Sequence, residues 1–321
     1  MKNNRREFLK IAGLAGVGLS GAGFSSYAAS SDKRTGQSTT DQPRPRSGQR
    51  FNMSGYAAPK LERVRIGYVG IGGRGSGALT RLTRIEGTEI KALCDILPDR
   101  AVAGAERLKK TGLPKPDLYT AGENDWKKVC DRDDIDLIYV STPWKLHAPI
   151  AAYAMNHGKH AAVEVPVATT LEECWQLVET SENTRRHCMM ISNVCYDFFE
   201  MLVLNMCRQG FFGDIIHGEG AYLHTFGFNP ENKIKTWRIS ENATRNGNLY
   251  PTHGAGPVCQ ALNINCGDQM DFLVSVSSND FMMRNEFNKA AATDDFWKPF
   301  SAQANKTHRG NINTSGGTIK P

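Results

Sequence analysis

The chain has 321 residues, of which 40% are hydrophobic. This is enough apolar material for one large or two ordinary domains, and too much for a disordered chain. The 39 Lys and Arg residues exceed the 33 Asp and Glu residues, but no basic block interleaves with aromatic residues, so we expect no nucleic-acid partner. The eight cysteines are too sparse for a disulfide scaffold and form no C-x-x-C pair, so we expect no metal site.

The first 30 residues have the pattern of an export signal. Arg5 and Arg6 precede a Phe-Leu-Lys sequence, and a glycine-interrupted apolar run then leads to small residues up to Ser30. The arginine pair resembles twin-arginine (Tat) signals, and the alternative is an ordinary amphipathic helix. We expect a signal peptide over 1–30, export by the Tat machinery to a periplasmic or extracellular location, and no stable membrane span. Residues 31–60, rich in Ser, Thr, Gln and Pro, indicate a flexible linker.

A glycine-rich loop follows the first predicted strand, at residues 64–69. The loop reads G-x-G-x-x-G and contains Gly70, Gly72, Gly73, Arg74 and Gly75. A predicted helix comes next, and then a strand over 89–94 that ends in Asp95. Such glycines let the backbone approach a pyrophosphate at the helix N-terminus, and the carboxylate accepts hydrogen bonds from a ribose. The pattern predicts a dinucleotide site, and Asp95 favours NAD over NADP because it would repel a 2′-phosphate.

Strands and helices continue to alternate up to about residue 192. Helices are predicted over 98–110, 147–156 and 170–182, and strands over 135–140 and 161–165. This alternation predicts an α/β fold with a doubly wound parallel sheet, a Rossmann domain over 61–192. Ligands bind at the carboxyl edge of such sheets. The predicted strand ends carry Trp144, His147, Glu164, Val165 and Asn193.

Two further motifs follow predicted strands. They are S-T-P-x-x-x-H from Ser141 to His147 and E-x-P from Glu164 to Pro166, and with the glycine loop they resemble the Gfo/Idh/MocA oxidoreductases. Val165 stands where that superfamily usually has lysine, which disfavours an ordinary sugar dehydrogenase. Together with Tyr-Pro-Thr-His at 250–253, the motifs resemble the NAD-dependent glycoside hydrolases of family 109, typified by α-N-acetylgalactosaminidase. The resemblance extends from the twin arginines to about Ser278.

The resemblance implies roles for individual residues. Trp144 and His147 would lie at the nicotinamide end of NAD, with Val165 and Asn193 on the cofactor side, and Glu164 would bond the ribose or the substrate. A terminal N-acetylhexosamine would contact Tyr222, Arg238, Tyr250, Pro251, Thr252 and His253. His253 is the candidate base for the C3 hydroxyl, since imidazole titrates near neutral pH. Tyr196 is the candidate base for the C2 proton, and Tyr250 is a further catalytic candidate.

The implied reaction starts with NAD⁺ oxidising C3 of the sugar, which acidifies the C2 proton. Elimination then expels the aglycone, water adds, and the hydride returns to C3, so that no net redox change occurs. No carboxylate pair is evident in the sequence, in agreement with the known exception of NAD-dependent glycosidases to the two-carboxylate rule.

The second half, residues 193–321, is expected to form a partial α+β substrate and dimerisation domain. A helix is predicted over 200–209, and strands at 215–216, 221–223 and 272–274. The resemblance implies an open, mainly antiparallel sheet, which often pairs subunits into a homo-oligomer. Residues 285–321 are polar and predict little core, and the chain is expected to be truncated relative to the family. Two alternatives remain: a sugar dehydrogenase that releases NADH, or an inactive protein that only binds NAD or sugar.

Overall fold

The structure is a computed structural model that describes residues 51–224, 229, 236–245, 248–274 and 281–307. The predicted signal peptide and most of the predicted linker therefore lie outside the described residues. Within the described part of the chain, no helix combines the length and the apolar character needed to cross a membrane.

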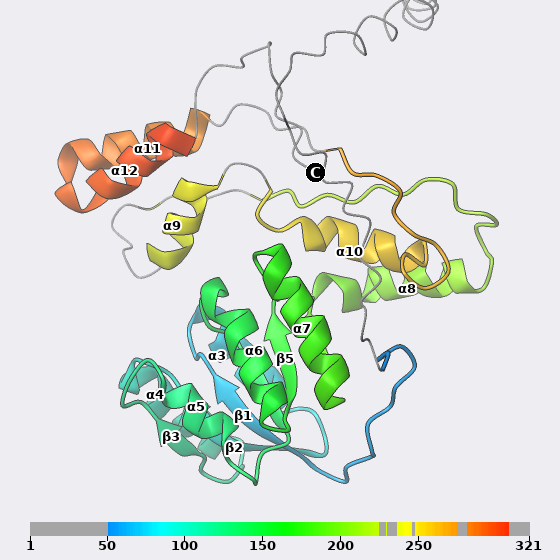
Figure 1. Ribbon diagram of the computed structural model, residues 1–321. Helices are drawn as coiled ribbons and strands as arrows, with labels where there is room; N and C mark the ends of the chain where they lie inside the picture. The colour runs from blue at the N-terminus through cyan, green and yellow to red at the C-terminus, as the bar shows by residue number, and fades with distance from the viewer. Residues whose placement is uncertain (1–50, 225–228, 230–235, 246–247, 275–280, 308–321) are drawn as a thin grey trace, which may run out of the picture. The chain divides into compact units, whose positions relative to one another are not determined.

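A six-stranded parallel sheet forms the first half of the described chain (Figure 1). Its strands are β1 (Val64–Val69), β2 (Thr88–Cys94), β3 (Asp117–Tyr119), β4 (Leu137–Val140), β5 (His160–Glu164) and β6 (Cys188–Ile191), in the order β3-β2-β1-β4-β5-β6. Val69, the last residue of β1, pairs with Cys94 on one side and Val140 on the other. Strand order reverses between β1 and β4, which is the switch point where ligands bind in such sheets. The predicted doubly wound sheet is confirmed.

Helices cover both faces of the sheet. They are α3 (Gly73–Leu82), α4 (Pro98–Lys110), α5 (Asp125–Cys130), α6 (His147–Asn156) and α7 (Leu171–Thr184). Buried residues of α3 and α4 share one hydrophobic cluster, whereas those of α5, α6 and α7 share another. The predicted capping box is present, because the Thr170 hydroxyl accepts from Glu173 N–H and the Glu173 carboxylate reaches back to Thr170 N–H. β3 and α5 were not predicted, since both are short and rich in polar residues.

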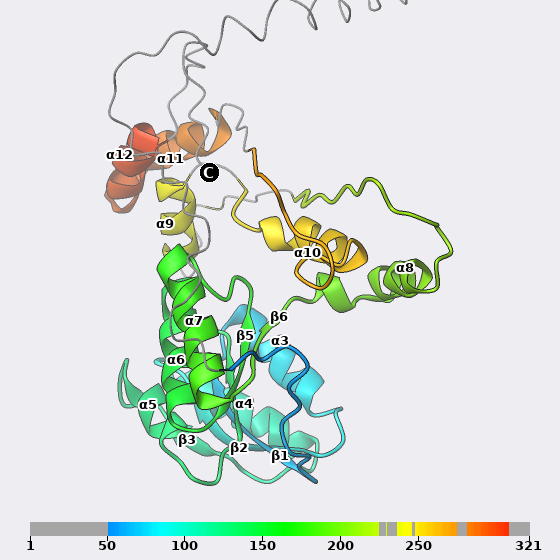
Figure 2. The ribbon, with the colours of Figure 1, turned by 45° about the vertical axis from the view of Figure 1, so that its right-hand side comes forward.

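The described second half is helical. It contains α8 (Phe198–Arg208), α9 (Thr236–Thr244), α10 (Pro251–Ala261), α11 (Phe281–Thr293) and α12 (Lys298–Thr307), and α8 lies beside α10 in both ribbon views (Figures 1 and 2). The predicted helix over 200–209 is confirmed as α8. The predicted strands at 215–216, 221–223 and 272–274 are wrong for the described residues, which form no ladder there. Alternation favours an extended backbone, but a strand also needs a neighbouring strand for its hydrogen bonds.

Residues 281–307 form a small core with α9, against the expectation from their polar composition. Phe287, Trp297 and Ala304 are fully buried, and they cluster with Ile239 and Ala243 of α9. A few apolar side chains at helical spacing are enough to bury one face of each helix, and the polar residues between them remain in solvent. The polar composition of this segment as a whole therefore gave no indication of the core.

Candidate functional site

The glycine loop, which joins β1 to α3 and runs into the first turn of that helix, contains two kinds of glycine. Gly70 has φ +92°, and a Cβ there would lie 2.7 Å from the Ser141 backbone. A Cβ on Gly75 would lie only 2.1 Å from the Gly70 carbonyl oxygen. Packing within the chain therefore requires both glycines. Gly72 and Gly73 differ, because a Cβ on Gly72 would meet only the Arg100 Nη1 at 3.6 Å, and one on Gly73 would meet nothing within 4 Å.

The outer side of this loop fits a dinucleotide. Gly72 caps α3 without a side-chain hydrogen bond, and the first turn of the helix has no acidic residue. In the described part of the chain no capping side chain accepts from the N–H groups of that turn, and the helix dipole favours an anion beside them. A pyrophosphate matches this donor set and the open space above Gly72 and Gly73.

Asp95 ties the glycine loop to the end of β2. Its Oδ2 accepts a hydrogen bond from Ile71 N (2.7 Å), and its Oδ1 accepts one from Leu97 N (2.9 Å). The carboxylate lies at the edge of the sheet where the sequence places the ribose contact, and each of its oxygens keeps a lone pair for a further donor. The predicted preference for NAD over NADP stays a prediction.

Two tyrosines that the sequence reasoning missed support the site from inside the sheet. The rings of Tyr68 and Tyr139 stack with centroids 4.7 Å apart. Tyr68 donates to the Gly75 carbonyl (2.7 Å), and Tyr139 donates to Glu164 Oε1 (2.9 Å). Burial raises the pKa of both phenols, so they act as neutral hydrogen-bond donors. The only signal for them in the sequence is an aromatic residue with a polar tip inside each buried aliphatic strand.

Glu164 ends β5 as a buried carboxylate with a cation beside it. Arg74 donates from Nε to Glu164 Oε1 (3.1 Å) and from Nη2 to Asn193 Oδ1 (3.2 Å). The Glu164 side chain is 6% exposed and the Arg74 side chain 47% exposed. An arginine from the glycine loop therefore supplies positive charge beside Glu164, which directly precedes Val165 in the chain.

His147 links the loops that follow β4 and β5. Its Nδ1 lies 2.7 Å from the Pro166 carbonyl oxygen and its Nε2 lies 2.8 Å from the Thr142 carbonyl oxygen. The residue is 1% exposed, and burial lowers its pKa, whereas the two carbonyls oppose that shift. Because both ring nitrogens face backbone carbonyls, this geometry suits holding the loops together rather than direct contact with a ligand.

An aromatic cluster surrounds Tyr250, at the start of α10. The Tyr250 ring lies 5.4 Å from both Tyr222 and His253, and Trp144 packs edge-on at 5.2 Å. The guanidinium of Arg238 lies 4.8 Å from the centre of the Tyr250 ring and donates a hydrogen bond to its phenol oxygen. Pro251 occupies the first helical position of α10, where its fixed φ suits the start of a helix. The structure thus brings most of the predicted sugar contacts together.

His253 lies in the first turn of α10, in an environment that favours its neutral form. Burial lowers its pKa most, Arg74 and Arg238 lower it further, and Glu164 opposes them. The Nδ1 of His253 and the Oγ1 of neighbouring Thr252 are buried and have no hydrogen-bond partner among the described residues. Buried polar atoms normally have partners, so these two are available to a bound molecule.

Tyr196 is the predicted site residue that lies apart from this cluster. It ends a short 3₁₀ helix (Val194–Tyr196) after β6 and is 51% exposed, and no described ring contact or side-chain hydrogen bond joins it to His253. Trp237, which the sequence reasoning did not single out, packs on Trp144 at 5.4 Å. Among the described residues, no three His, Cys, Asp or Glu side chains are arranged to hold a metal ion.

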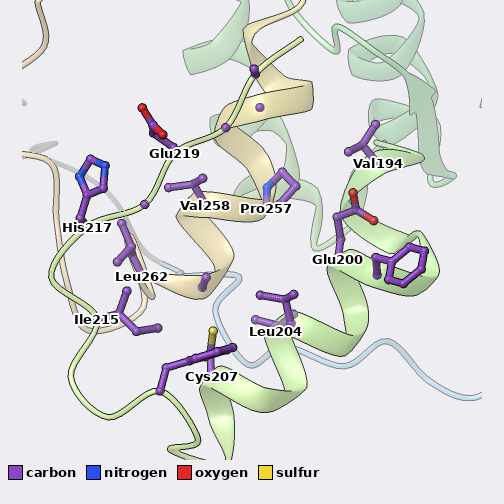
Figure 3. Close-up of a pocket in the computed structure, with 18 of the residues that line it drawn as sticks. Val194, Glu200, Leu204, Cys207, Ile215, His217, Glu219, Pro257, Val258 and Leu262 are labelled. Atoms are coloured by element: carbon purple, nitrogen blue, oxygen red, sulfur yellow. The ribbon is translucent and has the colours of Figure 1, made fainter. Parts of the chain in front are cut away.

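A cavity of about 640 Å³ lies between α8, α10 and residues 215–221 (Figure 3). Its walls are mainly apolar, with Val194, Leu204, Val258 and Leu262 among them. His253 and Gly254 also line the cavity. Glu200, His217 and Glu219 also line the cavity, and Figure 3 shows the side chains of His217 and Glu219 pointing outward from their segment, away from α10.

Family models match two successive parts of the chain. Residues 64–192 match "Oxidoreductase family, NAD-binding Rossmann fold". Residues 196–318 match "Glycosyl hydrolase 109, C-terminal domain". The aldose-aldose oxidoreductase from Caulobacter crescentus has a similar fold, with a TM-score of 0.51 and 20% identity over 63% of this chain and 58% of that chain. The fold and the glycine loop together define an NAD-binding Rossmann protein of the Gfo/Idh/MocA type, with NAD as its cofactor.

Curated relatives identify the family more closely. The chain is 49% identical over 238 residues to a glycosyl hydrolase family 109 protein from Porphyromonas gingivalis, which covers 74% of this chain and 51% of that one. It is 45% identical over 281 residues to the alpha-N-acetylgalactosaminidase of Shewanella oneidensis, and the aligned region covers 86% of this chain and 58% of that one. The chain belongs to glycosyl hydrolase family 109. It spans about half the length of the curated relatives it matches.

The two kinds of glycine in the loop give the first testable prediction. Gly73→Ala should leave the melting temperature unchanged or raise it, because the new methyl meets no atom of the chain, yet it should weaken NAD binding by occupying the cofactor's space. Gly75→Ala should lower both the melting temperature and NAD affinity. Calorimetric titration with NAD⁺ and thermal unfolding without it measure the two effects. Normal NAD affinity in Gly73→Ala would contradict the placement of the pyrophosphate at Gly72, Gly73 and the first turn of α3.

Proposed function

We propose that the protein removes terminal α-linked N-acetylgalactosamine from glycans by NAD-dependent hydrolysis. The observation that carries this proposal is the convergence of Tyr222, Arg238 and His253 on Tyr250. The Tyr250 ring in turn packs on Trp144, which follows a strand of the NAD-binding sheet. A sugar contact set and a cofactor site are thus adjacent in one chain. The name of the Shewanella oneidensis relative supports the choice of sugar.

Several described residues would hold the cofactor. Gly72, Gly73 and the first turn of α3 would receive the pyrophosphate, and Asp95 would receive the ribose. Trp144, Glu164 and Asn193 lie at or after the ends of neighbouring strands and would line the nicotinamide side. When bound, NAD⁺ supplies a hydride acceptor for C3 of the sugar and returns the hydride at the end of the cycle.

His253 is the proposed base for the C3 hydroxyl. Removal of that proton must accompany oxidation of the carbon, and a neutral imidazole can accept it. Burial and the two nearby arginines hold His253 in the neutral form, as the lowered pKa indicates. The same arginines can stabilise negative charge that develops on the sugar oxygen.

The C2 proton needs a second base, for which the geometry favours Tyr250 over Tyr196. Tyr250 contacts His253 directly, and the Arg238 guanidinium donates to its phenol oxygen, an interaction that stabilises a phenolate. Burial raises the pKa of Tyr250 and Tyr222 raises it further, whereas Arg238, Trp144 and Arg74 oppose that shift, so the phenolate also needs the positive charge that a bound nicotinamide would bring. Tyr196 has no such cation beside it in the described structure and is half exposed.

Hydrolysis of a chromogenic α-N-acetylgalactosaminide, with and without added NAD⁺, tests the proposal. We expect release of the chromophore without accumulation of NADH, because the hydride taken from C3 is returned. His253→Ala should lose this release and keep NAD affinity, since no cofactor-loop contact is changed. Accumulation of NADH would indicate a dehydrogenase, and binding of NAD without release of the chromophore would indicate a protein that only binds.

The fate of the C2 proton tests the choice of tyrosine. Cleavage in D₂O should place one deuterium at C2 of the released sugar, because that carbon loses its proton and regains one from solvent. Tyr250→Phe should slow cleavage by about a hundredfold or more, as expected for loss of a general base. Tyr196→Phe is the matched control and should cleave at the parent rate. Loss of activity in Tyr196→Phe alone would restore Tyr196 as the base.

The acid limb of the pH profile tests His253. A base works only when unprotonated, so kcat/KM should fall as the pH drops through the pKa of His253 in the free enzyme. Because that pKa is lowered, the midpoint should lie below the ordinary histidine value of about 6.5. Arg238→Gln removes a cation that lowers the pKa and should move the midpoint upward. A midpoint at or above the ordinary value in the parent protein would argue against His253 as the base.

A further inference from the structure

We propose that Trp237 is a further positioning residue of the sugar site, and that α11 and α12 hold it there by anchoring α9. The inference rests on the proposed function, because the site that Trp237 serves is the proposed sugar site. It adds a residue and a supporting element that neither the motifs nor the site geometry alone assign.

Trp237 acts through Trp144. The two indoles pack edge to face, with ring centroids 5.4 Å apart and planes at 73°. Trp144 is 4% exposed and packs in the same manner on Tyr250, at 5.2 Å and 84°. Edge-to-face contacts are directional, so each ring limits the rotation of the next. Trp237 therefore restrains Trp144, and Trp144 restrains Tyr250.

The neighbouring residue reaches the same tyrosine directly. Arg238 places its guanidinium 4.8 Å from the centre of the Tyr250 ring and donates to the phenol oxygen. Two consecutive residues of α9 thus act on Tyr250, one through an intervening indole and one by contact. The position of α9 accordingly sets the position of Tyr250.

The other side of α9 is fixed by α11 and α12. Ile239 and Ala243 are 7% and 1% exposed and belong to the buried cluster with Phe287, Trp297 and Ala304. Ile239 lies roughly 200° around the helix from Trp237, so one side of α9 enters this cluster and the opposite side faces the sugar site. Phe287 and Trp297 are fully buried, so this cluster holds α9 in a fixed position.

Fluorine NMR of protein labelled with 5-fluorotryptophan tests the positional part without any need for catalysis. The chain has five tryptophans, and Trp144→Phe assigns the resonance of Trp144. Trp237→Ala should shift and broaden the Trp144 resonance, and Phe287→Leu should move the resonances of both Trp144 and Trp237. Trp175→Phe, on α7, is the matched control and should leave both unchanged. An unchanged Trp144 resonance in Trp237→Ala would overturn the proposal.

Steady-state kinetics with the chromogenic glycoside tests the effect on the sugar. Trp237→Ala should raise KM about tenfold and also lower kcat, because Trp144 and, through it, the proposed base Tyr250 lose a restraint, whereas NAD affinity should change less because the glycine loop is intact. Trp237→Phe keeps an aromatic edge and should recover most of the parent KM. Phe287→Leu should raise KM in the parent background but add little to Trp237→Ala, since both act through the same contact.

Other outcomes would contradict the inference. A parent-like KM in Trp237→Ala would show that the indole does not position the sugar site. Equal losses of NAD affinity and KM, without rescue by Trp237→Phe, would show a general structural role instead. If the parent protein fails to cleave the glycoside, the proposed function fails, whereas the fluorine spectra still decide whether Trp237 restrains Trp144.

Discussion

The site depends on one constraint, the shared carboxyl edge of a parallel sheet. Because all six strands run in the same direction, the residues that follow them meet at one edge, whatever their separation in sequence. Arg74, Glu164 and Asn193 are separated by many residues and nevertheless form one hydrogen-bonded group there. The stacked pair of Tyr68 and Tyr139 fixes this group from within the sheet, since one phenol bonds the glycine loop and the other bonds Glu164.

The helical second half builds on that edge. α10 starts at Pro251 and presents Tyr250 and His253 to Trp144 and Tyr222, and α9 adds Arg238 above the tyrosine ring. The arrangement combines one half-buried imidazole, two phenols and two guanidinium groups beside the ring of Trp144. In the proposed reaction, such a set would bind a neutral, hydroxyl-rich ligand and transfer protons to and from it. Most other glycosidases use a pair of carboxylates for proton transfer.

Much of this arrangement could be predicted from the sequence. The glycine loop, the parallel sheet of an α/β fold and the capped helix α7 follow from local patterns, because each motif fixes its own backbone geometry. The strands predicted at 215–216, 221–223 and 272–274 are not formed by these described residues, since alternation at 221–223 specifies an extended backbone but no partner. The core of Phe287, Trp297 and Ala304 was missed because its few apolar residues are spread through polar helices. Trp237 was missed because a contact between side chains more than ninety positions apart has no local pattern.

The pairing of Arg74 with Glu164 also joins the proposed cofactor site and the proposed sugar site electrostatically. Arg74 belongs to the loop that faces the dinucleotide, and its guanidinium at the same time lowers the proton affinity of His253 across the sugar site. A change in the charge around Arg74 should therefore alter both the electrostatics of the glycine loop and the pKa of His253. If binding of the dinucleotide changes the affinity for the sugar by some factor, binding of the sugar must change the affinity for the dinucleotide by the same factor.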